Sequence, residues 1–174
     1  MNKILIVVDM QNDFVSGSLG SPEAQAIVPT VVEKVKNWDG TLTVYTRDTH
    51  FNDYSETLEG QKLPVEHCIF DEKGWSIIDE LKEVVKSKSL TIDKYTFGCE
   101  RWKEALGDLG YYSEFEIIGL VTDICVVSNA LALRMFYPDA KITVDASCCA
   151  GTSPEAHAAA LTVMKSCQID VIGE

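Results

Sequence analysis

The sequence alternates short runs of β-forming residues with longer stretches of helical periodicity, and this alternation leaves few folds open to the chain. The runs are rich in Ile, Val, Thr and Leu with little polar alternation, which is typical of strands buried on both faces. The predicted strands are Ile4–Asp9, Thr41–Asp48, Leu90–Lys94, Phe115–Leu120, Lys141–Ala146 and Asp170–Ile172. The predicted helices are Pro22–Trp38, Trp75–Lys86, Glu100–Leu109, Asp123–Phe136 and Pro154–Cys167.

Repeated strand–helix units imply right-handed crossovers and a mostly parallel sheet with helices on both faces. We therefore predict one doubly wound α/β domain over residues 1–174, with six strands in the common order 3-2-1-4-5-6. Ser21 and Ser153, each followed by Pro and Glu, are predicted helix caps. The stretch Thr49–Gly74 lacks clear periodicity, and a long irregular connection inside a compact domain is usually functional.

The composition excludes several kinds of partner. A formal net charge of −12 would repel nucleic acids and anionic membranes, so neither is an expected partner. The apolar run before Asp9 is far shorter than a membrane span and has no cleavage site after it, so we interpret it as a core strand. Six cysteines without a CxxC pair favour free thiols in a reducing, cytoplasmic environment. The Ala- and Val-rich stretch Val126–Met135 suits either the core or a homo-oligomer interface.

Polar residues with useful chemistry fall where predicted strands end. Asp9, Asp48 and Lys94 end the first three strands, and Cys125 follows the fourth within a few residues. In open α/β sheets, ligands bind outside the carboxyl ends of the strands, near the point where the strand order reverses. We therefore expect these four side chains to converge on one edge of the sheet.

Cys125 is a candidate nucleophile, although a cysteine among apolar residues is also a common core residue. It lies in the predicted first turn of a helix, where the helix dipole and free N–H groups favour a thiolate and an oxyanion. Asp9 would supply a base for the thiol, and Lys94 a cation to hold the thiolate. Their simpler interpretation is a loop-organising carboxylate and a solvated strand end.

Asp48, His50 and His67 are candidate ligands of a divalent metal. Alternate residues of an extended segment point the same way, so Asp48 and His50 can reach one ion from one side. One carboxylate and two imidazoles suit Zn²⁺, Fe²⁺ or Mn²⁺. Two histidines in a surface loop remain an equally good interpretation of this spacing. The third histidine, His157, is interpreted as a packing or surface residue.

Three ordered segments resemble the motifs of the isochorismatase-like cysteine hydrolases. Asp9–Phe14 resembles their first catalytic motif, Asp93-Lys94 their lysine motif, and Gly119–Val126 their nucleophile motif. Asp48-x-His50 and Pro64–Cys68 resemble the metal motifs of the nicotinamidase branch of this family. The branch usually has Trp where this chain has Leu63, and some members carry a further loop histidine that is absent here.

The resemblance implies a cysteine amidohydrolase that converts nicotinamide to nicotinate and ammonia. Asp9, Lys94 and Cys125 would be its catalytic residues. It further implies that the backbone N–H groups of Val121 and Cys125 form an oxyanion hole, with a cis peptide between Leu120 and Val121.

The resemblance also implies a divalent metal on Asp48, His50 and His67, with Zn as the expected ion and Fe or Mn as alternatives. Phe14 and Phe97 are candidate walls of the substrate pocket, and core packing is their alternative role.

Other functions stay open on the sequence alone. The first is hydrolysis of another small amide, a carbamoyl or a ureido compound by the same catalytic residues. The second is a non-catalytic family member that binds a metal or ligand. A third interpretation, a redox sensor using Cys148 and Cys149 or Cys68 and Cys99, rests only on their proximity, and adjacent cysteines after a strand more often reflect packing.

Overall fold

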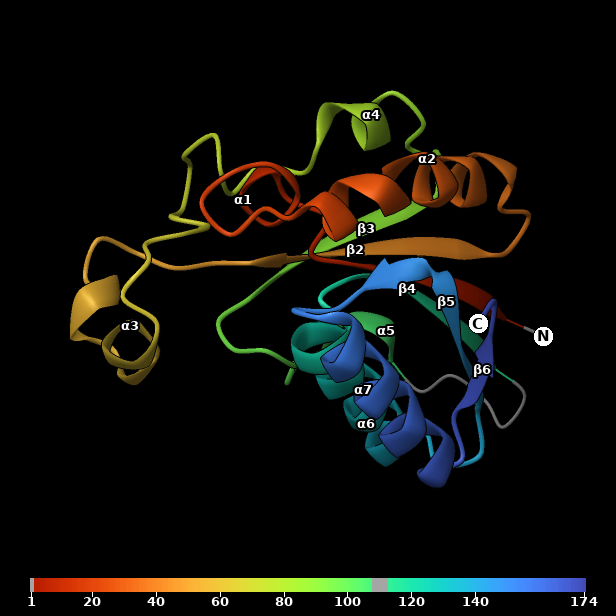
Figure 1. The fold of residues 1–174 in the computed structure, drawn as a ribbon. Coiled ribbons are helices and arrows are strands. Elements are labelled where there is room, and N and C mark those ends of the chain that lie inside the picture. The colour runs from red at the N-terminus through yellow and green to blue at the C-terminus, as the bar shows by residue number, and fades with distance from the viewer. Residues whose placement is uncertain (1, 108–112) are drawn as a thin grey trace.

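Six parallel strands form one sheet in the order β3-β2-β1-β4-β5-β6 in the computed structural model, which describes residues 2–107 and 113–174 (Figure 1). The strands are β1 Lys3–Val8, β2 Leu42–Asp48, β3 Ser89–Lys94, β4 Glu114–Leu120, β5 Lys141–Ala150 and β6 Asp170–Ile172. Each predicted strand is present and the predicted order is confirmed. Strand β5 runs four residues beyond its predicted end because Cys149 and Ala150 pair with Gly119 and Leu120 after an irregularity in the register.

Helices cover both faces of the sheet, which confirms the doubly wound arrangement (Figure 1). One face carries α1 Asn12–Val15, α2 Pro22–Asn37 and α4 Asp79–Lys82, and the other carries α5 Trp102–Leu106, α6 Val127–Phe136 and α7 Pro154–Ser166. The side chains of Ser21 and Ser153 accept backbone N–H groups at the first turns of α2 and α7, as predicted. Strands β1 and β4 lie in the middle of the sheet with almost fully buried side chains.

The predicted helix Trp75–Lys86 is wrong in extent, because only Asp79–Lys82 is helical. Tertiary pairing overrides the local pattern here: Ile77 forms a bridge with Gln11, and the Ile78 N–H donates to the Met10 carbonyl. The segment therefore runs extended along the loop after β1 before it turns into α4.

Two other helices begin or end differently from the prediction. The predicted Glu100–Leu109 is helical only over Trp102–Leu106 and ends at Gly107, and the positions after residue 107 lie outside the described residues. The predicted Asp123–Phe136 opens with a single wide π-turn, η2 Thr122–Val126, before α6. Cys125 lies in this turn.

The segment predicted to be irregular contains two short helical pieces that the sequence did not indicate. They are the 3₁₀ turn η1 Tyr54–Glu56 and the helix α3 Leu58–Lys62. Figure 1 shows α3 standing apart from the layers of the α/β body, next to the carboxyl ends of the strands. Thr57 caps α3 by accepting the Gly60 N–H.

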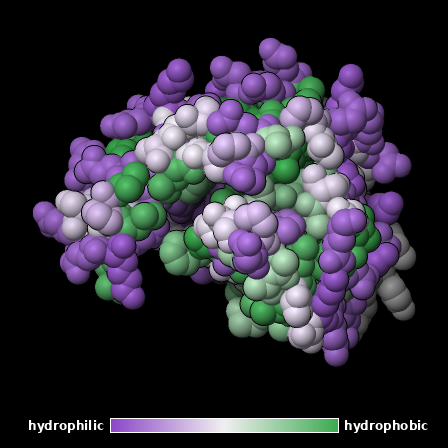
Figure 2. Space-filling view, viewed as in Figure 1, coloured by the Kyte–Doolittle hydropathy of each residue, from purple (hydrophilic) through white to green (hydrophobic). Residues whose placement is uncertain are grey.

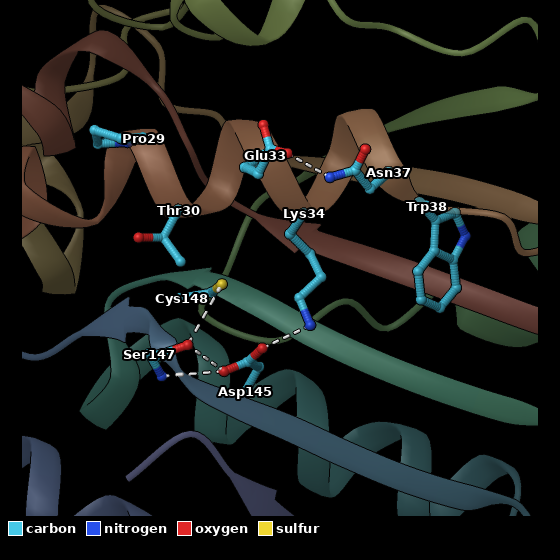
Figure 3. A pocket seen from close by; sticks show the side chains of 9 residues that line it. All are labelled: Pro29, Thr30, Glu33, Lys34, Asn37, Trp38, Asp145, Ser147 and Cys148. Carbon is cyan, nitrogen blue, oxygen red and sulfur yellow. Dashed lines mark hydrogen bonds and ion pairs between the residues drawn. The ribbon is translucent and has the colours of Figure 1, made fainter.

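An ion-pair network joins α2 to β4 and β5 on the face of the sheet that α2 covers, beside a cavity of about 670 Å³ (Figure 3). Lys34 Nζ lies 2.6 Å from Glu116 Oε1 and 2.7 Å from Asp145 Oδ2. Asp145 Oδ1 also accepts the backbone N–H and the hydroxyl of Ser147. Burial alone would raise the pKa of Asp145, but the hydrogen bonds from Lys34 and Ser147 outweigh it and the pKa is lowered.

We expect Lys34→Met to destabilise the fold at neutral pH and much less in acid. A carboxyl whose pKa is lower in the folded state stabilises the fold above its unfolded pKa of about 3.9, and this contribution is lost as pH falls through the folded value. The variant keeps the packing of the stem but leaves Asp145 without its cationic partner, at a cost of roughly 1–2 kcal/mol near pH 7. Urea unfolding at pH 7 and pH 3 measures the difference. An equal loss at both pH values would contradict this role.

Candidate active site

Lys94 is a fully buried ammonium at the carboxyl end of β3, and it forms the centre of the candidate site. Its Nζ lies 2.7 Å from Asp9 Oδ2, 3.2 Å from Asp48 Oδ1 and 3.6 Å from Cys125 Sγ. It also donates to the Thr96 carbonyl at 3.1 Å. Burial lowers the pKa of this ammonium, but the surrounding anions outweigh burial and raise the pKa well above its usual value. Lys94 is therefore charged at neutral pH.

Asp9 follows β1 in a left-handed conformation with φ of 48° and no exposed surface. Thr46 of the neighbouring β2 donates its hydroxyl to Asp9 Oδ1 at 2.7 Å, which fixes the carboxylate. Burial raises the pKa of Asp9, although the ammonium of Lys94 opposes the rise. A carboxylate of raised pKa is a better proton acceptor than an exposed one, which suits a general base.

Cys125 lies in the π-turn at the carboxyl end of β4, and its side chain is buried beside Lys94. Burial raises the pKa of the thiol well above its usual value, with Asp9 and Asp48 adding to the rise and Lys94 opposing it. The resting group is therefore a thiol, and a nearby base is needed to form the nucleophile. The Leu120–Val121 peptide before the turn is cis, as the sequence resemblance implied.

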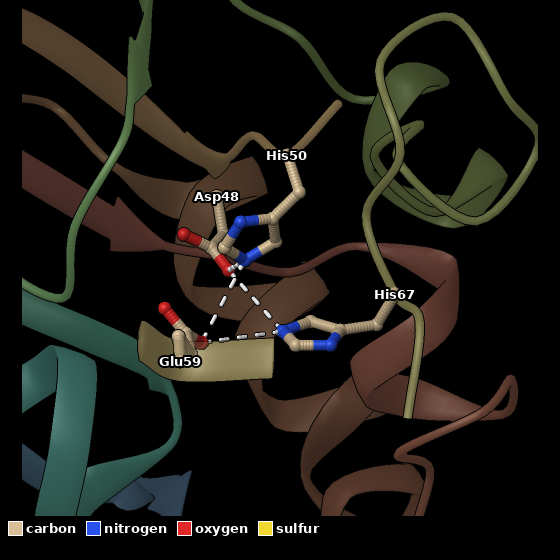
Figure 4. Close-up of side chains that lie close together, drawn as sticks. All are labelled: Asp48, His50, Glu59 and His67. Carbon is tan, nitrogen blue, oxygen red and sulfur yellow. Dashed lines mark hydrogen bonds and ion pairs between the residues drawn. The ribbon is translucent and has the colours of Figure 1, made fainter. Parts of the chain in front are cut away.

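Four side chains with metal-binding atoms meet beside Lys94 (Figure 4). Asp48 and His50 come from the end of β2, Glu59 from α3 and His67 from the loop that follows. One ligand atom of each lies within 4.8 Å of the others. His50 Nε2 is 3.0 Å from Asp48 Oδ2, and His67 Nε2 is 3.6 Å from the same oxygen.

The donor set and the local charge of this cluster fit a divalent cation. The Nδ1–H of His67 donates to the Val65 carbonyl at 2.8 Å, which leaves Nε2 as the ring nitrogen directed at the cluster. Asp9, Asp48 and Glu59 bring three carboxylates, whereas Lys94 brings one cation. Buried charge of this kind requires compensation. Two carboxylates and two imidazoles are ligands that Zn²⁺, Fe²⁺ and Mn²⁺ accept.

Gln11 fixes the position of Asp48, which belongs to both halves of the site. Its side-chain oxygen accepts the Asp48 N–H at 2.7 Å, and its amide nitrogen donates to the Asp48 carbonyl at 2.9 Å. The same nitrogen donates to the Trp75 carbonyl at 2.8 Å. Gln11 is fully buried, and its side-chain amide pairs with the backbone of Asp48, the last residue of β2, as a neighbouring strand would.

An open pocket of about 490 Å³ leads to the sulfur of Cys125 and to the metal-binding cluster. Its lining consists of Phe14, Leu19, Asp48, Leu58, Glu59, Lys62, Leu63, His67, Phe97, Val121, Ile124 and Cys125. The predicted walls Phe14 and Phe97 therefore both line it, and Phe97 is 42% exposed at its mouth. Figure 2 shows apolar side chains, in green, where the part of the molecule around α3, at the left, faces the sheet and its covering helices.

The structure brings together every side chain that the sequence singled out for the site. It adds Glu59, which the sequence analysis missed, and the signal for it was weak: an acidic residue between His50 and His67, where no histidine occurs. His157, predicted to be a packing or surface residue, is half-buried, and its Nδ1 lies 2.8 Å from the Thr122 hydroxyl at the nucleophile turn. Glu59 reaches the other three ligands only through the fold, because α3 places it beside Asp48, His50 and His67.

Four of the five cysteines outside the site are buried. All six have free thiols, as predicted. Cys148 and Cys149 are adjacent on β5 and pack into opposite faces of the sheet, in two different core clusters. This arrangement favours packing over a redox role.

The profile of the Isochorismatase domain matches residues 3–173. The chain therefore belongs to the isochorismatase family. The nicotinamidase of Schizosaccharomyces pombe is 24% identical over 98% of this chain and 92% of its own length. The structure of a nicotinamidase/pyrazinamidase from Bacillus subtilis has a TM-score of 0.83 at 24% identity, covering 99% of this chain and all of the other. A Pyrococcus horikoshii pyrazinamidase in complex with zinc has a TM-score of 0.81 at 24% identity, and each chain is covered completely.

No helix in the described part of the chain is long and apolar enough to span a membrane.

Proposed function

We propose that this chain is a metal-assisted cysteine amidohydrolase, with nicotinamide as substrate and nicotinate and ammonia as products. The observation that carries the proposal is the contact of Lys94 with Asp9, Asp48 and Cys125, which joins a base, a cation and a thiol to the metal-binding cluster. Family membership and the similarity to nicotinamidases over nearly the whole chain support it. The charge of −12 disfavours nucleic acids and anionic membranes as partners, which leaves a small molecule as the expected ligand. Five buried free thiols favour the reducing cytoplasm.

Asp9 accepts the proton of Cys125 Sγ, and the thiolate, held by the ammonium of Lys94, attacks the amide carbon. The backbone N–H groups of Val121 and Cys125 stabilise the tetrahedral oxyanion. The C–N bond then breaks as Asp9 returns the proton to the departing ammonia. Asp9 next takes a proton from water, the hydroxide attacks the thioester, and the released Cys125 sulfur regains its proton as nicotinate leaves.

Asp48, His50, Glu59 and His67 would hold the divalent ion, and we propose Zn²⁺, with Fe²⁺ or Mn²⁺ as alternatives. When bound, the ion would attract the ring nitrogen of the substrate and withdraw charge from the ring. Phe14 and Phe97 would flank the ring between the ion and the sulfur. This arrangement would present the carboxamide carbon to Cys125.

A second candidate is the hydrolysis of another small amide, carbamoyl or ureido compound by the same residues. The observation that supports it is Leu63, which lines the pocket at the position where the nicotinamidase branch usually has Trp. The two candidates share Asp9, Lys94 and Cys125 and differ in their use of the metal.

Ammonia release from nicotinamide and from a panel of aliphatic amides, carbamoyl and ureido compounds tests the proposal. The protein is assayed as purified, after removal of metal with a chelator, and after return of Zn²⁺, Fe²⁺ or Mn²⁺. We expect nicotinamide to be the best substrate, with activity lost on chelation and restored by metal. Hydrolysis of another amide with no nicotinamidase activity, by metal-loaded protein, would move the substrate to the second candidate.

A further inference from the structure

Asn129 has no exposed surface, lies four residues after Cys125 on α6, and forms all the hydrogen bonds that an amide can form. Its Oδ1 accepts the backbone N–H of Cys99 at 2.9 Å and the indole N–H of Trp102 at 3.2 Å. Its Nδ2 donates to the carbonyl of Cys125 at 2.8 Å and to that of Phe97 at 3.2 Å. Two donors face the oxygen and two acceptors face the nitrogen, so only one orientation of the amide fits.

Three of these partners, Phe97, Cys99 and Cys125, belong to the segments that carry the reacting groups, whereas Trp102 opens α5. Phe97 and Cys99 lie in the loop after β3, which delivers Lys94, and this loop returns to Lys94 through the Thr96 carbonyl. The loop also packs closely on α6, because a Cβ at Gly98 would lie 3.4 Å from a backbone oxygen of Ser128. Asn129 therefore bridges the loop after Lys94 and the turn that holds the sulfur.

Burying the amide of Asn129 costs free energy that an apolar side chain at the same core position would not cost. A buried polar side chain stabilises a fold little in net terms, whereas an apolar side chain of similar size would fit a core without requiring partners. Asn129 lies among apolar neighbours of the core, beside Val126, Ala130 and Leu133. The specific gain from the amide is the fixed position of its two carbonyl partners.

We propose that Asn129 is a positioning residue for the reaction at Cys125. By holding the Cys125 and Phe97 carbonyls from one nitrogen, it sets the 3.6 Å approach of Sγ to Lys94 Nζ and the position of the pocket wall. Small displacements of reacting groups are sufficient to matter, since a shift of about 1 Å can reduce a rate about 100-fold. This inference rests on the proposed function for its substrate and its kinetic test, whereas a test by alkylation of Cys125 needs no substrate.

The test compares Asn129→Asp with Trp102→Phe. The first variant keeps the oxygen that accepts from Cys99 and Trp102 but replaces the nitrogen that donates to Cys125 and Phe97. The second removes one hydrogen bond from the same network and leaves the Cys125 and Phe97 bonds intact. We expect Asn129→Asp to lower kcat about 10- to 100-fold with KM changed less than about threefold. Trp102→Phe should lose stability but keep its kcat.

The rate of alkylation of the Cys125 peptide by iodoacetamide, followed by mass spectrometry, gives a readout that needs no substrate. We expect this rate to change in Asn129→Asp and to remain at the wild-type value in Trp102→Phe. If Asn129→Asp does not fold, Asn129→Ser, which introduces no buried charge, is measured in its place with the same expectation. If the wild type hydrolyses no amide, the proposed function fails while the alkylation comparison still decides the role of Asn129. Unchanged kcat and alkylation in the Asn129 variants, or equal losses in Trp102→Phe, would overturn the inference.

Discussion

Cys125→Ala is expected to remain folded and metal-binding but to lose amide hydrolysis almost completely. Removal of a nucleophile from a site that works as a unit typically lowers kcat about 10⁴- to 10⁶-fold. The side chain is small and buried, and it is not a member of the metal-binding cluster, so the fold and the metal content should be retained. Ammonia release, circular dichroism and metal content of the purified variant measure the three properties.

Cys149→Ala is the matched control for this prediction. Cys149 is equally small, is buried in the same core cluster and forms no part of the pocket. Its removal should cost stability, roughly 1 kcal/mol, and leave kcat near the wild-type value. Comparable activity in Cys125→Ala and Cys149→Ala would show that the thiol of Cys125 is not the nucleophile.

Lys94→Met is expected to abolish activity and also to destabilise the protein severely. The substitution leaves the Asp9 and Asp48 carboxylates buried without their shared cation, and breaking a buried ion pair in this way costs about 3–5 kcal/mol. Without the ammonium, nothing holds a thiolate at Cys125. Chemical unfolding at pH 7 measures the first effect, and ammonia release the second.

The double variant Lys94→Met/Asp9→Asn separates charge from packing. Replacing Asp9 by its neutral amide removes one of the two orphaned carboxylates, so part of the lost stability should return. Activity should not return, because the base and the cation are both missing. If the double variant is no more stable than Lys94→Met, the loss comes from packing rather than from unpaired charge.

Much of the sheet and of the catalytic edge could be predicted because buried parallel strands leave a strong local pattern. Asp9, Asp48 and Lys94 lie at strand ends. The topology of a doubly wound sheet brings such ends to one edge regardless of the conformation of the loops. The confirmed order β3-β2-β1-β4-β5-β6 places β1 and β4 side by side, and with them Asp9 and the turn of Cys125.

The features that escaped prediction depend on contacts between distant segments. Glu59 joins the metal-binding cluster only because α3, a single turn capped by Thr57, folds back toward His50 and His67. The extended course of residues 75–78 arises from hydrogen bonds to the loop after β1, which compete with a helical pattern that is locally adequate. Gln11 likewise acts through its contacts with Asp48, and no sequence spacing encodes such contacts.

The most direct measurement is the capture of the covalent intermediate in the first turnover. Metal-loaded wild-type protein is mixed with nicotinamide, quenched in acid within the first turnover, and digested for mass spectrometry. We expect a mass increase equal to a nicotinoyl group on the peptide that contains Cys125, and no such increase in Cys125→Ala. Hydrolysis of nicotinamide without any adduct at Cys125, or with an adduct on another residue, would contradict the role of Cys125 as the nucleophile.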